Sequence, residues 1–162
     1  MKTHQYTVNI HWDSDRKGMM CSPEISETKP EKGCIEVATP PQFPKGIPGI
    51  WSPEHLFTAS VSSCFMTTFL AIAENSKLNF TSFECNAIGV LDNVNDKLVM
   101  TEVILEPVVT LTDEKDHDRA LRILQRTESN CLISNSIKSK VSMKPTIKLG
   151  AVVTKDVSMN FN

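Results

Sequence analysis

The stretch SPEHLFTASVSSCFMTTFLAIAE, residues 52–74, decides the fold. It opens with Ser52, a favoured N-cap, and with Pro53, a residue favoured at the first helical position. Glu54 then complements the positive end of the helix dipole. Residues 56–73 continue for 18 positions without a formal charge, which predicts a helix roughly 27 Å long at about 1.5 Å per residue. We expect the rest of the chain to pack around this helix.

A charge-free helix of this length raises the question of a membrane span. Hydroxyl side chains dilute its apolar character, and no cluster of Lys or Arg flanks either end. A helix that is apolar around most of its circumference is typical of the buried axis of a soluble domain, so we expect no membrane partner. The hydroxyl residues are Thr58, Ser60, Ser62, Ser63, Thr67 and Thr68.

Length and charge narrow the class of protein further. A chain of 162 residues suits a single domain, residues 1–162, with a core of its own. The net charge of −2 gives no reason to expect nucleic acid as a partner. The first ten residues, MKTHQYTVNI, contain no apolar segment of the signal-peptide type, and we therefore expect a cytoplasmic protein.

The chain contains five cysteines, and without an export signal we expect most of them to be reduced thiols. An odd number also fits poorly with a complete disulfide framework, so any disulfide is expected to be transient and chemical. The five are Cys21, Cys34, Cys64, Cys85 and Cys131.

Patterns of apolar residues predict the elements on either side of the helix. Alternation from Tyr6 to Trp12 indicates a half-buried strand, which a charged turn, residues 13–18, joins to a return strand beginning near Met19. The polar residues 24–33 read as a turn. Residues 34–38 read as a short strand, and residues 39–49, with four prolines and two glycines, as a rigid loop.

The second half of the chain predicts a hairpin, a helix and closing strands. Pro107 is expected to bend the second hairpin strand or to place it at a sheet edge. This order of elements indicates an α+β fold with mostly antiparallel sheet. The predicted elements are a hairpin of strands 80–91 and 98–111 around a turn at 92–96, a second helix capped by Thr112 or Asp113, a helical turn at 134–140, and one or two strands within 141–154.

Cys64, near the middle of the central helix, is either a small buried hydrophobe or a reactive thiol. Burial in apolar surroundings raises a thiol pKa, and Cys64 lies too far from the helix N-terminus for the dipole to lower it. A reactive Cys64 therefore needs a cation from elsewhere. Arg16 and Lys17, in the first hairpin turn, are the best placed by topology, although a solvated hairpin tip is the plainer interpretation of both. Cys85 and Cys34 read as small hydrophobes, and Cys21 as incidental.

Glu54 and Cys131 are the remaining candidates for chemistry. The plain role of Glu54 is to complement the helix dipole. It lies roughly 15 Å from Cys64 along a straight helix, so it cannot contact that thiol directly. It could act on a thiol only by holding a bridging arginine or by reaching the Cys64 of a second subunit. Cys131 lies at a polar helix junction, TESNCLISNS. It reads as a buried loop cysteine or as a group that condenses with a sulfenic acid on Cys64.

Two segments of the chain resemble the signatures of the osmotically inducible protein C / organic hydroperoxide resistance (OsmC/Ohr) family. The first runs from Ser52 to Phe57 and continues with Ser63-Cys64-Phe65. The second is Glu128-x-x-Cys131-x-x-Ser134. The resemblance covers most of the chain, and the order of elements agrees with it. The family's proline after the second cysteine is replaced here by Leu132, and the loop at 39–49 is longer than a minimal family member needs.

The resemblance implies an intertwined homodimer that reduces organic hydroperoxides, with active sites at the subunit interface. By analogy, Cys64 is the peroxidatic cysteine, Cys131 the resolving cysteine and Glu54 the carboxylate that orients an arginine, for which Arg16 is the candidate. A dithiol of the lipoyl or another type reopens the Cys64–Cys131 disulfide, and the cycle needs no metal or other cofactor.

Two alternatives remain open at the level of sequence. The chain is a non-enzymatic member of the same fold, which binds a small apolar ligand or a partner and keeps its thiols redox-silent. Alternatively, Cys64, Cys131 and His55 form a metal site, although no CxxC or HxxxH spacing supports it and structural zinc usually has four ligands.

Overall fold

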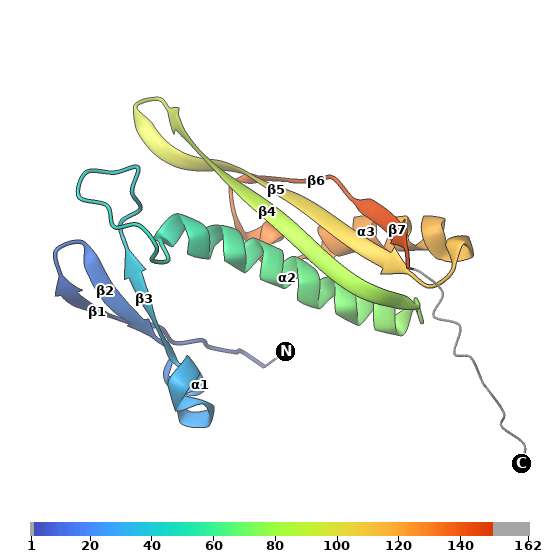
Figure 1. The fold of residues 1–162 in the computed structure, drawn as a ribbon, viewed down its shortest axis with the longest axis horizontal. Helices are drawn as coiled ribbons and strands as arrows, with labels where there is room; N and C mark the ends of the chain where they lie inside the picture. The colour runs from blue at the N-terminus through green and yellow to red at the C-terminus, as the bar shows by residue number, and fades with distance from the viewer. Residues whose placement is uncertain (1, 151–162) are drawn as a thin grey trace, which may run out of the picture. The chain divides into compact units, whose positions relative to one another are not determined.

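The computed structural model describes residues 2–150 and has an α+β architecture with two separate sheets, which confirms the predicted fold class (Figure 1). The chain divides into two compact units, Met1–Phe57 and Thr58–Asn162. That the two units form one folding domain stays a prediction.

The first unit is built on a three-stranded antiparallel sheet of order β1-β2-β3. The predicted polar turn at 24–33 contains two short helical segments, because Pro23 follows Ser22 at the N-cap position and starts a helix there. The elements of this unit are β1 (Asn9–Ser14), β2 (Lys17–Cys21), α1 (Pro23–Thr28), the 3₁₀ helix η1 (Pro30–Lys32) and β3 (Cys34–Ala38).

Of the strand predicted from the alternation of Tyr6 to Trp12, residues 9–12 belong to β1 and residues 6–8 lie before it, and β1 is not half-buried. Its apolar side chains are exposed, Trp12 to 78% and Ile10 to 62%. The alternation correctly indicates an extended strand, whereas burial depends on a covering layer, and within the described chain this face of β1 has none.

The second unit contains most of the central helix α2 (Pro53–Asn75), which runs along the long hairpin of β4 (Phe80–Val94) and β5 (Lys97–Leu111) (Figure 1). Phe65 and Phe69 stack on Phe83 of β4, with ring centroids 6.3 and 4.6 Å apart. A side chain at Gly89 on β4 would overlap the Thr58 hydroxyl of α2, so glycine lets helix and strand approach closely. The turn is shorter than predicted, because Asn95 and Asp96 alone adopt the positive φ that a tight hairpin requires.

β5 is the central strand of the second sheet, so the edge position expected as one alternative for Pro107 is wrong. β6 (Lys140–Met143) pairs with residues 102–105 of β5 and β7 (Thr146–Leu149) with residues 108–111, both in parallel. Pro107 lies between these two ladders, where its missing N–H is not needed. The part of the predicted closing strand at 151–154 lies outside the described residues.

The second predicted helix is α3 (His117–Asn130), preceded by a 3₁₀ turn, η2 (Glu114–Asp116). Neither Thr112 nor Asp113 caps α3, whose N-cap residue is Asp116. Asp113 instead caps η2, where its carboxylate accepts a hydrogen bond from the Lys115 amide at 3.0 Å. A further 3₁₀ turn, η3 (Ser134–Ser136), lies within the predicted helical turn.

α2 buries only one stripe of its surface within this chain, at Val61, Phe65, Phe69 and Ala73. By length and composition it is apolar enough to cross a membrane, so its hydroxyls do not dilute it as far as the sequence suggested. The core helix of a soluble protein passes the same test, and one stripe of α2 packs on β4 through the stacked phenylalanines. Much of its remaining apolar surface is uncovered in the single chain.

Candidate functional site

The buried stripe of α2 determines where Cys64 lies. Cys64 directly precedes the fully buried Phe65 and follows Val61 by three positions. Because 3.6 residues complete a helical turn, Cys64 sits at the flank of the stripe rather than at its centre. Its thiol is therefore only partly buried and remains accessible from outside the chain.

Cys131 is the C-cap of α3 and is fully buried. The residues that follow it form a tight turn, in which the Cys131 carbonyl accepts from the Asn135 amide at 3.0 Å and the Leu132 carbonyl from the Ser136 hydroxyl at 2.8 Å. These hydrogen bonds fix the backbone after Cys131, so that the amide of Ile133 is held in one direction.

The amide of Ile133 donates a hydrogen bond to Sγ of Cys64 at 3.5 Å, and this contact joins α2 to the turn after α3. Burial alone would raise the pKa of the Cys64 thiol. Hydrogen bonding from the Ile133 amide, from the Cys131 and Thr68 side chains and from the Leu132 amide outweighs burial, and the net pKa is lowered. Donors favour the thiolate over the thiol, so Cys64 is the more acidic of the two cysteines.

Cys131 has the opposite shift. Burial raises the pKa of its thiol, and the neighbouring Cys64 raises it further, although Ser134 opposes both effects. Two thiols in contact cannot both ionise easily, because the second negative charge forms beside the first. The first proton therefore leaves Cys64, and Cys131 stays a thiol that donates to it.

The structure thus brings together two of the four predicted site residues, Cys64 and Cys131, within the second unit. Glu54, in the first turn of α2, and Arg16, in the exposed turn between β1 and β2, belong to the first unit. Their roles at Cys64 stay predictions.

The first unit does distinguish between the two candidate cations. Lys17 contacts the carboxylates of Glu36 at 3.1 Å and Asp13 at 3.3 Å, and these contacts raise the pKa of its ammonium group. Among the described residues, the Arg16 side chain makes no ion pair. Of the two cations, Arg16 is therefore the one whose charge is not already matched on the sheet surface.

His55 is engaged with Ser52 at the start of α2. The Ser52 hydroxyl lies 2.9 Å from Nδ1 of His55 and also accepts from the His55 amide at 3.3 Å. An open pocket of about 370 Å³ is lined by His55, Gly49, Ile50 and Trp51. Among residues 2–150, no three His, Cys, Asp or Glu side chains lie close enough together to hold a metal ion, and this includes the set of Cys64, Cys131 and His55.

The remaining cysteines require one correction. Cys21 and Cys34, expected to be unpaired, form a disulfide, because the register of β2 and β3 places them directly opposite each other. The expectation of reduced thiols was based on spacing and cell compartment, and neither reveals strand register. Cys85 is a free thiol of β4, and burial raises its pKa.

Three groups that act on Cys64 were missed by the sequence reasoning, namely the Thr68 side chain and the backbone amides of Leu132 and Ile133. Thr68 follows Cys64 by four positions, and the helical period alone places the two on one face, so this signal was present. The Ile133 contact comes from a backbone amide 69 residues away. No side-chain pattern could have identified it.

Comparison with known proteins gives a family and a fold. A family model described as OsmC-like protein matches residues 46–146, more than half of the chain. The uncharacterized protein YmaD of Bacillus subtilis is 22% identical over 161 residues, covering 93% of this chain and 99% of that protein.

Solved structures share the fold at low sequence identity. An OsmC-like protein of unknown function from Vibrio cholerae has 23% identity and a TM-score of 0.76, covering 88% of this chain and 99% of its own. An organic hydroperoxide resistance protein OsmC from Legionella pneumophila has 19% identity and a TM-score of 0.69, covering 91% of this chain and 99% of its own.

Proposed function

The chain belongs to the OsmC-like protein family, and we propose that it is a cysteine-based peroxidase that reduces organic hydroperoxides to alcohols. One observation carries the proposal. An accessible thiol of lowered pKa, Cys64, receives a hydrogen bond from the Ile133 amide, and a second thiol, Cys131, is among the groups that lower its pKa. Organic substrates are proposed because structural relatives include an organic hydroperoxide resistance protein.

In the first step, the Cys64 thiolate attacks the terminal oxygen of the hydroperoxide and breaks the O–O bond. The products are a sulfenic acid on Cys64 and an alkoxide, which takes up a proton to become the alcohol. A donor that stabilises negative charge on the sulfur also favours ionisation before the attack, and the Ile133 amide supports this stage.

In the second step, Cys131 attacks the sulfur of the sulfenic acid, water leaves, and a Cys64–Cys131 disulfide forms. Before the first step the neighbouring Cys64 helps to raise the Cys131 pKa. Once Cys64 has become a neutral sulfenic acid, that contribution is removed, so Cys131 ionises more readily at the stage that requires it.

An external dithiol then completes the cycle. Its thiolate attacks the disulfide, and its second thiol resolves the mixed disulfide, so that two electrons pass to the protein and the reductant leaves as a disulfide. A cytoplasmic location, with its reducing dithiols, suits this step.

We assign to Arg16 the role of the cation at Cys64 and to Glu54 that of the carboxylate that orients it. A guanidinium presents two parallel donors to a carboxylate, which an ammonium group does not. Arg16→Lys should therefore slow peroxide reduction almost as much as Arg16→Ala. Lys17→Ala should leave the rate nearly unchanged, because Lys17 is engaged with Glu36 and Asp13.

The proposed assembly is a homodimer. Apolar side chains stay exposed on two elements of the single chain, Met66 and Leu70 on α2 and Ile10 and Trp12 on β1. Exposed apolar side chains that gather on one element are typical of a protein–protein interface. A second copy of the chain would cover it, and light scattering at micromolar concentration measures this directly.

The activity is tested by single turnover with cumene hydroperoxide in the background Cys21→Ser Cys34→Ser, so that only three thiols are counted. We expect the parent to consume one equivalent of peroxide and lose two free thiols. Cys64→Ser should consume none. Cys131→Ser should complete the first turnover, accumulate a sulfenic acid that dimedone traps, and fail to cycle with a dithiol.

Cys85→Ser is the matched control, since Cys85 is also a free and partly buried thiol, but its pKa is raised by burial. It should behave as the parent does. Peroxide consumption that survives in Cys64→Ser, or a parent that loses no thiols, would overturn the proposed function.

The second candidate function is a ligand-binding protein with redox-silent thiols, and the open pocket beside Trp51 and His55 favours it. Under this alternative, Cys64 reacts with iodoacetamide no faster than an ordinary thiol. An apolar ligand then quenches the fluorescence of Trp51 in a Trp12→Phe background, with no consumption of peroxide.

A further inference from the structure

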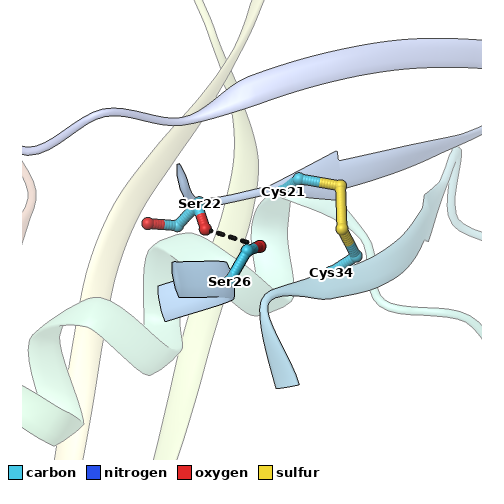
Figure 2. Close-up of a disulfide and its surroundings, with 4 residues drawn as sticks. All are labelled: Cys21, Ser22, Ser26 and Cys34. Carbon is cyan, nitrogen blue, oxygen red and sulfur yellow. Dashed lines mark hydrogen bonds between the residues drawn. A yellow bond between two sulfur atoms is a disulfide. The ribbon is translucent and has the colours of Figure 1, made fainter. Parts of the chain in front are cut away.

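The first unit carries a second pair of sulfur atoms, which the proposed peroxidase cycle does not use. Cys21 at the end of β2 and Cys34 at the start of β3 form a disulfide with their Cα atoms 4.1 Å apart (Figure 2). The pair lies outside residues 46–146, the part of the chain matched by the family model.

The sheet holds the two cysteines opposite each other independently of the disulfide. β2 and β3 pair over five positions that end at Cys21 and Cys34, and just beyond them the Ser22 amide donates to the Gly33 carbonyl at 2.8 Å. The cysteines are therefore a non-hydrogen-bonded pair, in which opposing side chains are closest. With the ladder in place on both sides, the two thiols stay within bonding reach after reduction.

The disulfide is also accessible to a reactant in solution. Cys34 is exposed and Cys21 partly exposed. A thiol–disulfide exchange needs the attacking thiolate to approach a sulfur atom from outside, so accessibility sets whether the reaction occurs without unfolding.

The disulfide closes the segment 22–33, which contains α1 and η1. Inside it, the Ser26 hydroxyl donates to the Ser22 carbonyl at 2.9 Å (Figure 2). The Glu24 carboxylate accepts from the Ser22 hydroxyl at 2.8 Å and from the Thr7 amide at 3.0 Å. The segment therefore holds the chain that leads into β1, and the disulfide fixes both ends of the segment.

We infer that Cys21 and Cys34 form a second, reversible dithiol–disulfide couple, which exchanges electrons with external dithiols and disulfides and whose state sets the order of residues 22–33. In reduction, a thiolate of the external dithiol attacks Sγ of Cys34, and the Cys21 thiolate leaves and takes up a proton. The second thiol of the reductant attacks the mixed disulfide and releases Cys34. Two electrons pass to the protein, and the reductant leaves as a disulfide. Reoxidation by an external disulfide runs the same steps in reverse.

The couple is tested in the full chain carrying Cys64→Ser, Cys85→Ser and Cys131→Ser, so that Cys21 and Cys34 are its only sulfhydryl groups. The protein is equilibrated without denaturant in mixtures of reduced and oxidised dithiothreitol, and its free thiols are then trapped with an excess of iodoacetamide at mildly alkaline pH, where the thiolate reacts. We expect peptide mass spectrometry to find two species, with both cysteines labelled or with neither, and their ratio to follow the buffer in both directions.

Two results would overturn the couple. One is labelling that appears only after denaturant is added, which would make the disulfide a fixed staple. The other is full labelling in oxidised dithiothreitol, which would mean that the disulfide does not form. Cys21→Ser in the same background is the control, and it should carry one label in every buffer. Because the background lacks Cys64 and Cys131, the outcome does not depend on peroxidase activity.

Hydrogen exchange on the two forms tests the effect on the segment. We expect the amides of Thr7, Ser26 and Lys29 to exchange several-fold faster in the reduced form, while those of the β4–β5 hairpin do not change. Glu24→Gln should accelerate exchange at Thr7 in the oxidised form without altering the labelling pattern. Equal exchange in the two forms would overturn the assignment of the segment to this couple.

Discussion

The backbone amide of Ile133 lies 3.5 Å from Sγ of Cys64 and donates a hydrogen bond to it, although the two residues are 69 positions apart in the chain. The contact depends on the turn after α3, in which neighbouring carbonyls are already satisfied and the amide is fixed in place. The acidity of the Cys64 thiol on α2 therefore depends on how the second unit folds.

The variant Thr68→Val tests whether a side-chain hydrogen-bond donor lowers the pKa of Cys64. The Thr68 hydroxyl is among the groups that lower this pKa, so its loss should raise the pKa and reduce the thiolate fraction at neutral pH. Because one hydrogen bond contributes about 1 kcal/mol, its loss should lower the alkylation rate by up to about fivefold. The rate is measured with iodoacetamide between pH 6 and about pH 9, a range below and around the usual thiol pKa.

Thr67→Val is the matched control for that experiment. The Thr67 hydroxyl donates to the backbone carbonyls of Ser63 and Cys64 rather than to the Cys64 thiol. Its rate profile should superimpose on the parent's. An unchanged profile in Thr68→Val would show that Thr68 does not act on the Cys64 thiol.

Loss of the Cys21–Cys34 disulfide should destabilise the first unit. The double variant Cys21→Ser Cys34→Ser removes a cross-link that closes a short loop, and the free energy of unfolding should fall by about 2–3 kcal/mol. Urea unfolding followed by the fluorescence of Trp12 and Trp51, both in this unit, measures it. The same fall should appear when the parent is reduced, and a parent unaffected by reductant would contradict the prediction.

Phe69→Ala should be the most damaging single truncation in α2. Phe69 is fully buried and contacts Phe80 and Phe83, with ring centroids 5.3 and 4.6 Å away. Removing a ring from such a site leaves a cavity and should cost about 3–5 kcal/mol of unfolding free energy. Thermal or urea unfolding measures the loss, and a cost of no more than about 0.5 kcal/mol, which is what a surface position usually shows, would contradict this account of the core.

Leu70→Glu separates packing within the chain from packing between copies. Leu70 is 41% exposed in the single chain, so the variant should fold, while a charge in the proposed dimer interface should weaken association by at least tenfold, which is about 1.4 kcal/mol. Sedimentation or light scattering over a dilution series gives the dissociation constant. Lys148→Glu, on exposed β7, is the control and should associate like the parent.

The parts of the fold that local patterns determine could be predicted from the sequence. The central helix was predicted from its N-cap, its proline and its charge-free length, and the hairpin from its β-branched residues. The edge position expected for Pro107 was wrong. A proline is tolerated on this central strand because it falls between the residues that pair with β6 and those that pair with β7, and the sequence does not reveal that division.

The sequence could predict the candidate site only where side chains, and not backbone groups, form it. The juxtaposition of Cys64 and Cys131 followed from two matching segments, whereas the Ile133 amide leaves no trace in the sequence pattern. The Cys21–Cys34 disulfide was missed because it depends on strand register. The exposure of β1 was missed because alternation reports an extended strand and not what covers it.

The complete burial of Cys131 has a consequence for the direction of the proposed cycle. Of the two sulfurs in a Cys64–Cys131 bridge, only the one on α2 presents itself to an incoming reagent, so the reductant must first become attached there and expel Cys131 as the leaving group. The buried sulfur of Cys131 does not react directly with a molecule from solution. Every covalent partner of the proposed peroxidase site, whether oxidant, reductant or inhibitor, would therefore attach and leave at one atom, Sγ of Cys64.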